Sequence, residues 1–226
     1  MARSKALIIA FYGIDGGGKT TLANLLVTIL RKKQTRVYSV RLRAHHTFMY
    51  LLTRIFFLLK GYNYKSIQGM PIFLNYIVKQ YFGRQRLYVA LEVVSVLAWY
   101  IMEILPRRIF GGKPIVFVAD RFLPDFIVIL HYTSGIRDDK LLKIYRFLER
   151  SMPLDIIYFY VYVDPDLAVA RKKEEKLHPQ FILYLASRYE RINVHLHHYI
   201  IDTTNKTPSE SLSLVLSYLK DLKHGD

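Results

Sequence analysis

The chain has 226 residues, of which 52% are hydrophobic and 23% are charged, and it contains no cysteine. This composition excludes a disordered chain, a disulfide-stapled domain and a metal site built from thiolates. Lysine and arginine total 33 against 18 acidic residues, a formal charge of +15 that favours an anionic partner such as a nucleotide, nucleic acid or acidic lipid, although a general solubility role explains the charge equally well.

The first part of the chain alternates apolar runs with helical patterns. Residues 6–12, ALIIAFY, are a short apolar run that ends at glycine, as is typical of a buried parallel strand. Leucine and isoleucine recur at helical spacing over 19–33, and 35–43 has the pattern of a second strand. Aromatic-rich helical patterns follow at 46–60 and 70–82.

The segment 86–109 has the pattern of a long apolar helix, and its part 87–105 is about long enough to span a bilayer. Glu92 and Glu103 lie inside it, and a carboxylate in hydrocarbon is costly, so a helix in the core of a soluble protein is favoured over a membrane span. The N-terminus lacks the apolar run and cleavage site of a secretory signal. We therefore expect a cytoplasmic protein.

The second part of the chain also alternates strands and helices. Asp164 caps a helix that has proline at its first position. The predicted strands are 115–120, 154–164 and 199–204, and the other predicted helices are 138–150, 180–198 and 208–223. Strands that alternate with helices predict an α/β fold, in which helices cover both faces of a parallel sheet.

Residues 13–20, GIDGGGKT, match the phosphate-binding pattern G-x-x-x-x-G-K-[ST] between a strand and a helix. Glycines let successive backbone N–H groups turn toward one anion, and the helix N-terminus adds partial positive charge. Lys19 supplies a cation to the β- and γ-phosphates, and Thr20 places its hydroxyl on Mg²⁺. A simple glycine-rich turn does not explain why Lys-Thr follows. The residues predicted to bind ATP are Gly13, Ile14, Asp15, Gly16, Gly17, Gly18, Lys19, Thr20 and Thr21.

This loop also occurs in switch proteins and ATPase motors. The chain has no guanine-reading N-K-x-D motif and is short for a motor. These two features favour a compact phosphotransferase.

Two further charged groups follow predicted strands. Asp120 and Arg121 end the run VFVADRF, where strand ends face the ligand crevice of an open α/β sheet. The carboxylate suits Mg²⁺ or an acceptor hydroxyl, and the arginine suits a phosphate; the alternative is an ion pair at the strand end. Arg41 and Arg43 follow the second strand and either reach the acceptor's phosphate or are ordinary surface arginines.

A basic segment at about 171–180 has the composition of a lid that brings charge to a transferring phosphate and excludes water. Its predicted lid cations are Arg171, Lys172, Lys173 and Lys176. The alternative is a solvated basic face. Asp15 lies inside the glycine loop, where a carboxylate needs an offsetting use such as an acceptor hydroxyl or metal-bound water.

Three blocks, FYGIDGGGKTTLANLL, VFVADRF and VYVDPDLAVARKKEE, with Tyr189, Ile201 and Asp202 further on, resemble the thymidylate kinase family of P-loop nucleoside monophosphate kinases. The resemblance implies a five-stranded parallel sheet, ATP and Mg²⁺, a deoxynucleoside monophosphate as acceptor, and a homodimer. It implies that Asp15 contacts the acceptor's sugar 3′-hydroxyl and that Arg121 holds its phosphate. Gly16 stands where some members carry a loop arginine, so the cation role falls to Arg171 and its lid neighbours.

The acceptor side departs from the family. RLRAHHT replaces the R-E-P-G block, and VVSVLAW stands near the place of an F-x-A-x-R helix.

We expect one P-loop kinase domain over 1–226 that transfers phosphate from ATP to dTMP in nucleotide biosynthesis, with the acceptor bound by Asp15, Arg41, Arg43, Arg121 and a helical region at about 46–110. The expected catalytic residues are Lys19, Asp120, Arg121 and Arg171. The expected metal ligands are Thr20 and Asp120. No nucleic acid or membrane partner is expected. The alternatives are a kinase of another small acceptor (a nucleotide, a nucleoside or a lipid-linked sugar) and a non-catalytic nucleotide-binding protein at a membrane surface.

Overall fold

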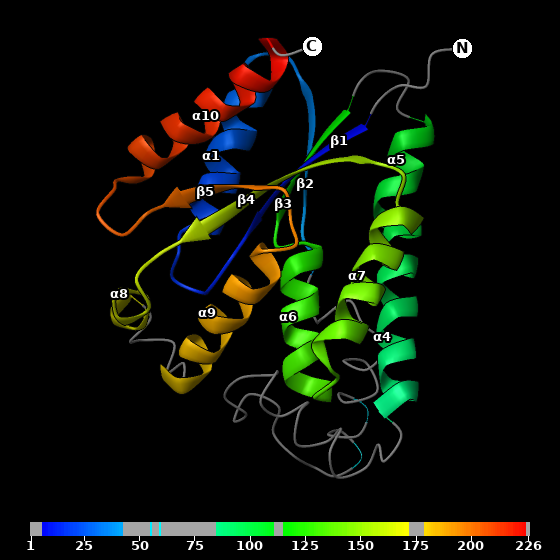
Figure 1. Ribbon diagram of the computed structural model, residues 1–226. Helices are drawn as coiled ribbons and strands as arrows, with labels where there is room; N and C mark the ends of the chain where they lie inside the picture. Colours follow the sequence, from blue (N-terminus) through cyan, green and yellow to red (C-terminus); the bar gives the residue numbers. More distant parts are fainter. Residues whose placement is uncertain are drawn as a thin grey trace. The chain divides into compact units, whose positions relative to one another are not determined.

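A computed structural model describes residues 6–42, 55, 59, 85–110, 115–171 and 179–224. Five strands form one parallel sheet in the order β2-β3-β1-β4-β5 (Figure 1). The predicted α/β fold of the P-loop NTPase type, with its five-stranded parallel sheet, is confirmed. The strands are β1 (Ala6–Tyr12), β2 (Arg36–Val40), β3 (Ile115–Asp120), β4 (Asp155–Tyr162) and β5 (His198–Asp202).

Helices connect these strands at most of the predicted positions. The predicted helices at 46–60 and 70–82 fall almost entirely outside the described residues, of which only Ile55 and Leu59 are helical there. The described helices are α1 (Lys19–Lys32), α4 (Gln85–Trp99), the π-helix η3 (Tyr100–Ile104), α5 (Leu105–Phe110), α6 (Leu123–Ser134), α7 (Asp138–Ser151), α8 (Pro165–Arg171), α9 (Pro179–Asn193) and α10 (Pro208–His224).

The chain, which we predicted to be one domain over 1–226, divides into two compact units. Unit 1 contains the sheet with α1, α8, α9 and α10, and unit 2 contains α4, η3, α6, α7 and most of α5. By residue number, unit 1 is Met1–Arg41, Phe110–Phe122 and Leu154–Asp226, and unit 2 is Leu42–Ile109 and Leu123–Pro153.

In unit 1, helices cover both faces of the sheet. Successive side chains of a strand point to opposite faces. Phe11 accordingly stacks on Phe159, with ring centroids 5.5 Å apart, in the core formed with α1 and α10, which lie side by side (Figure 1). The next residue, Tyr12, lies against Tyr160 and against Tyr189 of α9, with ring centroids 5.3 and 6.0 Å away. Burial of the Tyr160 hydroxyl raises the pKa of this side chain.

In unit 2, α4 packs against α6 and α7 and continues through the π-helical turn into α5. The hydroxyl of Tyr88 donates to Oγ1 of Thr133 at 2.8 Å, which joins α4 to α6. Burial, and next the nearby carboxylate of Glu92, raise the pKa of Tyr88. The helix α6 was not predicted from the sequence. Nine of its 12 residues are buried, including Asp125, so it has no polar face to mark a helical period.

Candidate nucleotide-binding site

The loop between β1 and α1 requires glycine at two crowded positions. Gly13 has φ +136°, and a Cβ atom there would lie 2.5 Å from the carbonyl oxygen of Val161. Gly16 has φ +91°, and its Cβ would lie 2.9 Å from the carbonyl oxygen of Ala168 in α8. A positive φ and a close backbone approach both exclude a larger residue. Gly16 therefore has no room for the loop arginine that some thymidylate kinases carry.

The N-terminus of α1 is open. Its N-cap, Gly18, is left-handed with φ 87°, and no side chain of the described residues caps the first turn. A Cβ atom added to Gly18 would meet nothing within 4 Å. The first N–H groups of a helix have no partner inside the helix and carry partial positive charge. This end of α1 is therefore suited to an anion.

Lys19, the first residue of α1, is folded onto the loop. Its side chain is only 4% exposed, and Nζ donates to the carbonyl oxygen of Ile14 at 2.6 Å. Nζ also lies 3.7 Å from Oδ1 of Asp15. These contacts hold a buried ammonium group over the predicted phosphate-binding loop.

Thr20 and Asp120 meet at the carboxyl end of β3, as predicted for a metal site. The Thr20 hydroxyl donates to Oδ2 of Asp120 at 2.7 Å. The other carboxylate oxygen, Oδ1, is buried and has no hydrogen-bond partner among the described residues. Arg41 forms an ion pair with Asp120 and donates from Nη2 to Oγ1 of Thr20 at 3.1 Å. Arg41, predicted to bind the acceptor, therefore lies beside the two predicted metal ligands.

Arg121 turns away from its neighbour Asp120 and pairs with the loop. It has φ +79°, which is unusual for a residue other than glycine. Its backbone N–H donates to the carbonyl oxygen of Phe11 at 3.0 Å, and its guanidinium group forms an ion pair with Asp15. The structure thus brings together the two residues predicted to bind the acceptor's sugar and phosphate.

Arg171, at the end of α8, lies beside the glycine loop. Its guanidinium group donates to the carbonyl oxygens of Gly16 at 3.2 Å, Thr203 at 3.1 Å and Thr204 at 3.4 Å. The backbone of α8 excludes a side chain at Gly16, and the last residue of the same helix, Arg171, contacts the Gly16 carbonyl oxygen. The predicted lid residues Lys172, Lys173 and Lys176, and the predicted acceptor residue Arg43, lie outside the described residues.

Thr203 is a loop residue that the sequence analysis missed. It is buried after β5, and its hydroxyl donates to the carbonyl oxygen of Gly17 at 3.0 Å. Nearby, a hydrogen bond from the backbone N–H of Thr204 lowers the pKa of Asp202. The position of Thr203 after a predicted strand could have indicated this contact, because the carboxyl ends of all parallel strands lie at one edge of the sheet.

No model of a known protein family matches this chain. A comparison with curated proteins gives no match either. Among the described residues, no group of three or more His, Cys, Asp or Glu side chains is placed to hold a metal ion. The resemblance to thymidylate kinases therefore depends on the quoted sequence blocks.

Proposed function

We propose that this chain is an ATP- and Mg²⁺-dependent phosphotransferase of the thymidylate kinase type, which makes dTDP from dTMP. One observation carries the proposal: the GIDGGGKT loop joins β1 to the uncapped N-terminus of α1, and buried Lys19 lies over that loop. Phosphoryl transfer needs little covalent chemistry from the protein, so positioning and charge stabilisation supply most of the rate.

On the donor side, the loop amides and the N-terminus of α1 would bind the polyphosphate, and Lys19 would reach the β- and γ-phosphates. Thr20 and Asp120 would hold Mg²⁺, because a hydroxyl and a carboxylate are the hard oxygen ligands that this ion prefers. Oδ1 of Asp120 fits that assignment, since it is buried and has no hydrogen-bond partner in the part of the chain that the structure describes. Bound Mg²⁺ would supply charge neutralisation on the phosphate oxygens.

On the acceptor side, the ion pair between Asp15 and Arg121 supports the roles that the resemblance implies. Asp15 would accept a hydrogen bond from the sugar 3′-hydroxyl, and Arg121 would bind the acceptor's phosphate. Arg171, beside the Gly16 carbonyl, would stabilise charge on the transferring group.

A second candidate is a P-loop kinase of a different small acceptor. The segment VVSVLAW lies in α4, whose only arginine is Arg86, at the exposed start of the helix. The buried side of α4 instead presents Glu92, Ser95 and Trp99. The arginine of the family's F-x-A-x-R helix therefore has no counterpart in VVSVLAW, which favours an acceptor other than dTMP.

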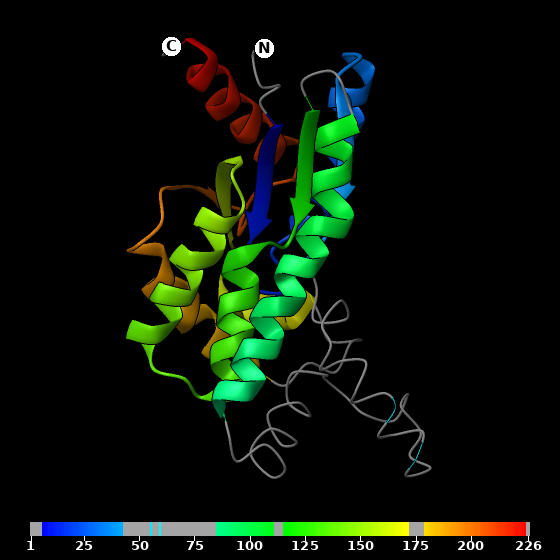
Figure 2. The ribbon, with the colours of Figure 1, turned by 90° about the vertical axis from the view of Figure 1, so that its right-hand side faces the viewer.

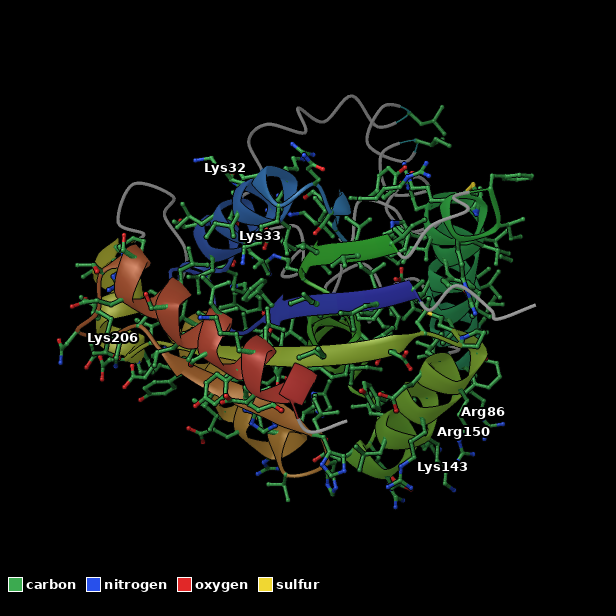
Figure 3. All side chains as sticks on the ribbon, turned by 90° about the horizontal axis from the view of Figure 1, so that it is seen from above. Lys32, Lys33, Arg86, Lys143, Arg150 and Lys206 are labelled. Atoms are coloured by element: carbon green, nitrogen blue, oxygen red, sulfur yellow. The ribbon has the colours of Figure 1, made fainter. Side chains whose placement is uncertain are left out.

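The proposal is tested by calorimetry with Mg·ATP and by ADP release across dTMP, other nucleoside monophosphates and thymidine. We expect wild type to bind Mg·ATP and to turn over fastest with dTMP, and Lys19→Met to lose both. Lys32→Met is the matched control, since Lys32 is an exposed lysine in the last turn of the same helix (Figure 3). Absence of heat with Mg·ATP would refute the proposal, and faster turnover of another acceptor would select the second candidate.

A further inference from the structure

Residues Arg86–Phe110 form one long helix, made of α4, η3 and α5, that is long and apolar enough to cross a membrane. A helix in the core of a soluble protein can have the same length and composition. The burial of each face therefore decides whether this is a core helix or a membrane-spanning helix. Figures 1 and 2 show α6 and α7 on one side of α4.

The covered face of this helix carries its polar groups. Tyr88, Glu92 and Ser95 are buried, and Tyr88 is hydrogen-bonded to α6. Further along, Trp99 and Ile104 are also buried. A helix that crosses a bilayer with lipid on every side has no face packed in a protein core. This helix has such a face, and a carboxylate is buried on it, so it does not cross a bilayer in that way.

The opposite face is exposed and apolar, which reverses the pattern of an ordinary surface helix. From 87 to 102, every residue that is exposed is apolar. Three of them recur at intervals of seven residues. The larger exposed side chains are between 51% and 69% exposed, and with Ala90 they make up the apolar stripe: Leu87, Ala90, Val94, Ile101, Met102 and Ile109.

Positive charge lies at both ends of the apolar stripe. Arg86 precedes it, and Arg107 and Arg108 lie near its other end, where Arg107 is paired with Glu103 at 2.6 Å. The whole chain carries +15.

We propose that the apolar stripe lies flat in the surface of an anionic lipid membrane. A contiguous exposed apolar face marks an interaction site, and arginines at its ends meet acidic headgroups while the apolar side chains enter the acyl boundary. This surface departs from our expectation of no membrane partner, and it does not depend on the proposed phosphotransferase activity.

Charge favours lipid over a second copy of the chain. If two stripes paired in parallel, Arg86 would approach Arg86 of the other copy. If they paired antiparallel, it would approach Arg107 and Arg108. Both arrangements bring like charges together at the rim of an interface, whereas acidic lipid is complementary to Arg86 at one end of the stripe and to Arg108 near the other.

The test is flotation of the full chain with phosphatidylcholine vesicles, with and without phosphatidylglycerol. We expect wild type to float only with the anionic vesicles. The double variant Val94→Glu, Ile101→Glu should lose flotation, because each change puts a carboxylate in the apolar stripe. Arg86→Glu should weaken flotation, and the flotation that remains should depend less on salt than that of wild type, because one attractive charge is lost. The matched control is Leu183→Glu in α9, whose side chain is 51% exposed like that of Val94, and it should float as wild type does.

Circular dichroism and Mg·ATP calorimetry on every variant establish that a loss of flotation is not a loss of folding. Failure of wild type to float, or flotation of the double variant equal to wild type, would overturn the proposal. So would light scattering that shows a wild-type dimer and a monomeric double variant, since the stripe would then be an interface between copies. Mg·ATP binding without flotation would overturn the membrane surface and leave the proposed nucleotide site intact.

Discussion

Arg171 provides the sharpest test of how the loop would act in catalysis. Its guanidinium group donates to three main-chain carbonyl oxygens, and it makes no ion pair with a carboxylate in the part of the chain that the structure describes. We expect Arg171→Ala to lower kcat about a thousandfold. A full positive charge about 4 Å from the transferring group contributes about 4 kcal/mol at an effective dielectric constant of about 20.

The same substitution also removes hydrogen bonds that hold the loop. Arg171 is exposed, so we expect this loss to cost about 1 kcal/mol, which lowers Tm by about 2–4 °C in a protein of this size. The effect on the reaction is therefore much larger than the effect on stability. The two are measured separately, by ADP release at saturating ATP with the best acceptor and by scanning calorimetry.

Two further variants separate charge from geometry. Arg171→Lys keeps the charge but loses the planar fork, so it should recover about tenfold of the lost kcat. Arg188→Ala removes an arginine of α9 whose guanidinium lies over the Tyr184 ring at 5.4 Å, and kcat should stay unchanged. An Arg171→Ala variant with kcat within about fivefold of wild type and with normal folding would remove Arg171 from the proposed reaction.

Two predictions concern stability. Gly16→Ala should lower Tm more than Gly18→Ala, because both residues have φ near +90° but only a Cβ atom at Gly16 would meet Ala168. We expect the free energies of unfolding of the two variants to differ by about 1–3 kcal/mol. Equal Tm values in thermal unfolding would contradict the argument from crowding at Gly16. Hydrogen bonds from Thr207 lower the pKa of Glu210 below its ordinary value of 4.5, so Glu210→Gln should be less stable than wild type at pH 7 in chemical denaturation. That difference should shrink as the pH falls below 4.5, because a lowered pKa stabilises only while the carboxylate is ionised.

Local patterns in the sequence were sufficient for much of the fold. The runs 6–12 and 115–120 are the strands β1 and β3 with the predicted bounds, because a short apolar run between loops has no other way to be buried on both faces. Asp164 caps α8 as predicted, by accepting hydrogen bonds from the N–H groups of Asp166 and Leu167. The helix α6 was missed for the opposite reason, since burial on nearly every side leaves no exposed polar face to reveal its period.

By itself, the sequence determined the composition of the loop: glycines where φ is positive, then Lys19 and Thr20 at the start of α1. Only the tertiary structure decided what these residues contact. Asp120 lies 100 positions from Thr20, and Thr203 lies 186 positions from Gly17, so their hydrogen bonds depend on the order of the strands in the sheet. Burial likewise decided which face of Arg86–Phe110 is covered. Tyr88, Glu92 and Ser95 recur at helical spacing and would be expected on an exposed face, but all three are buried.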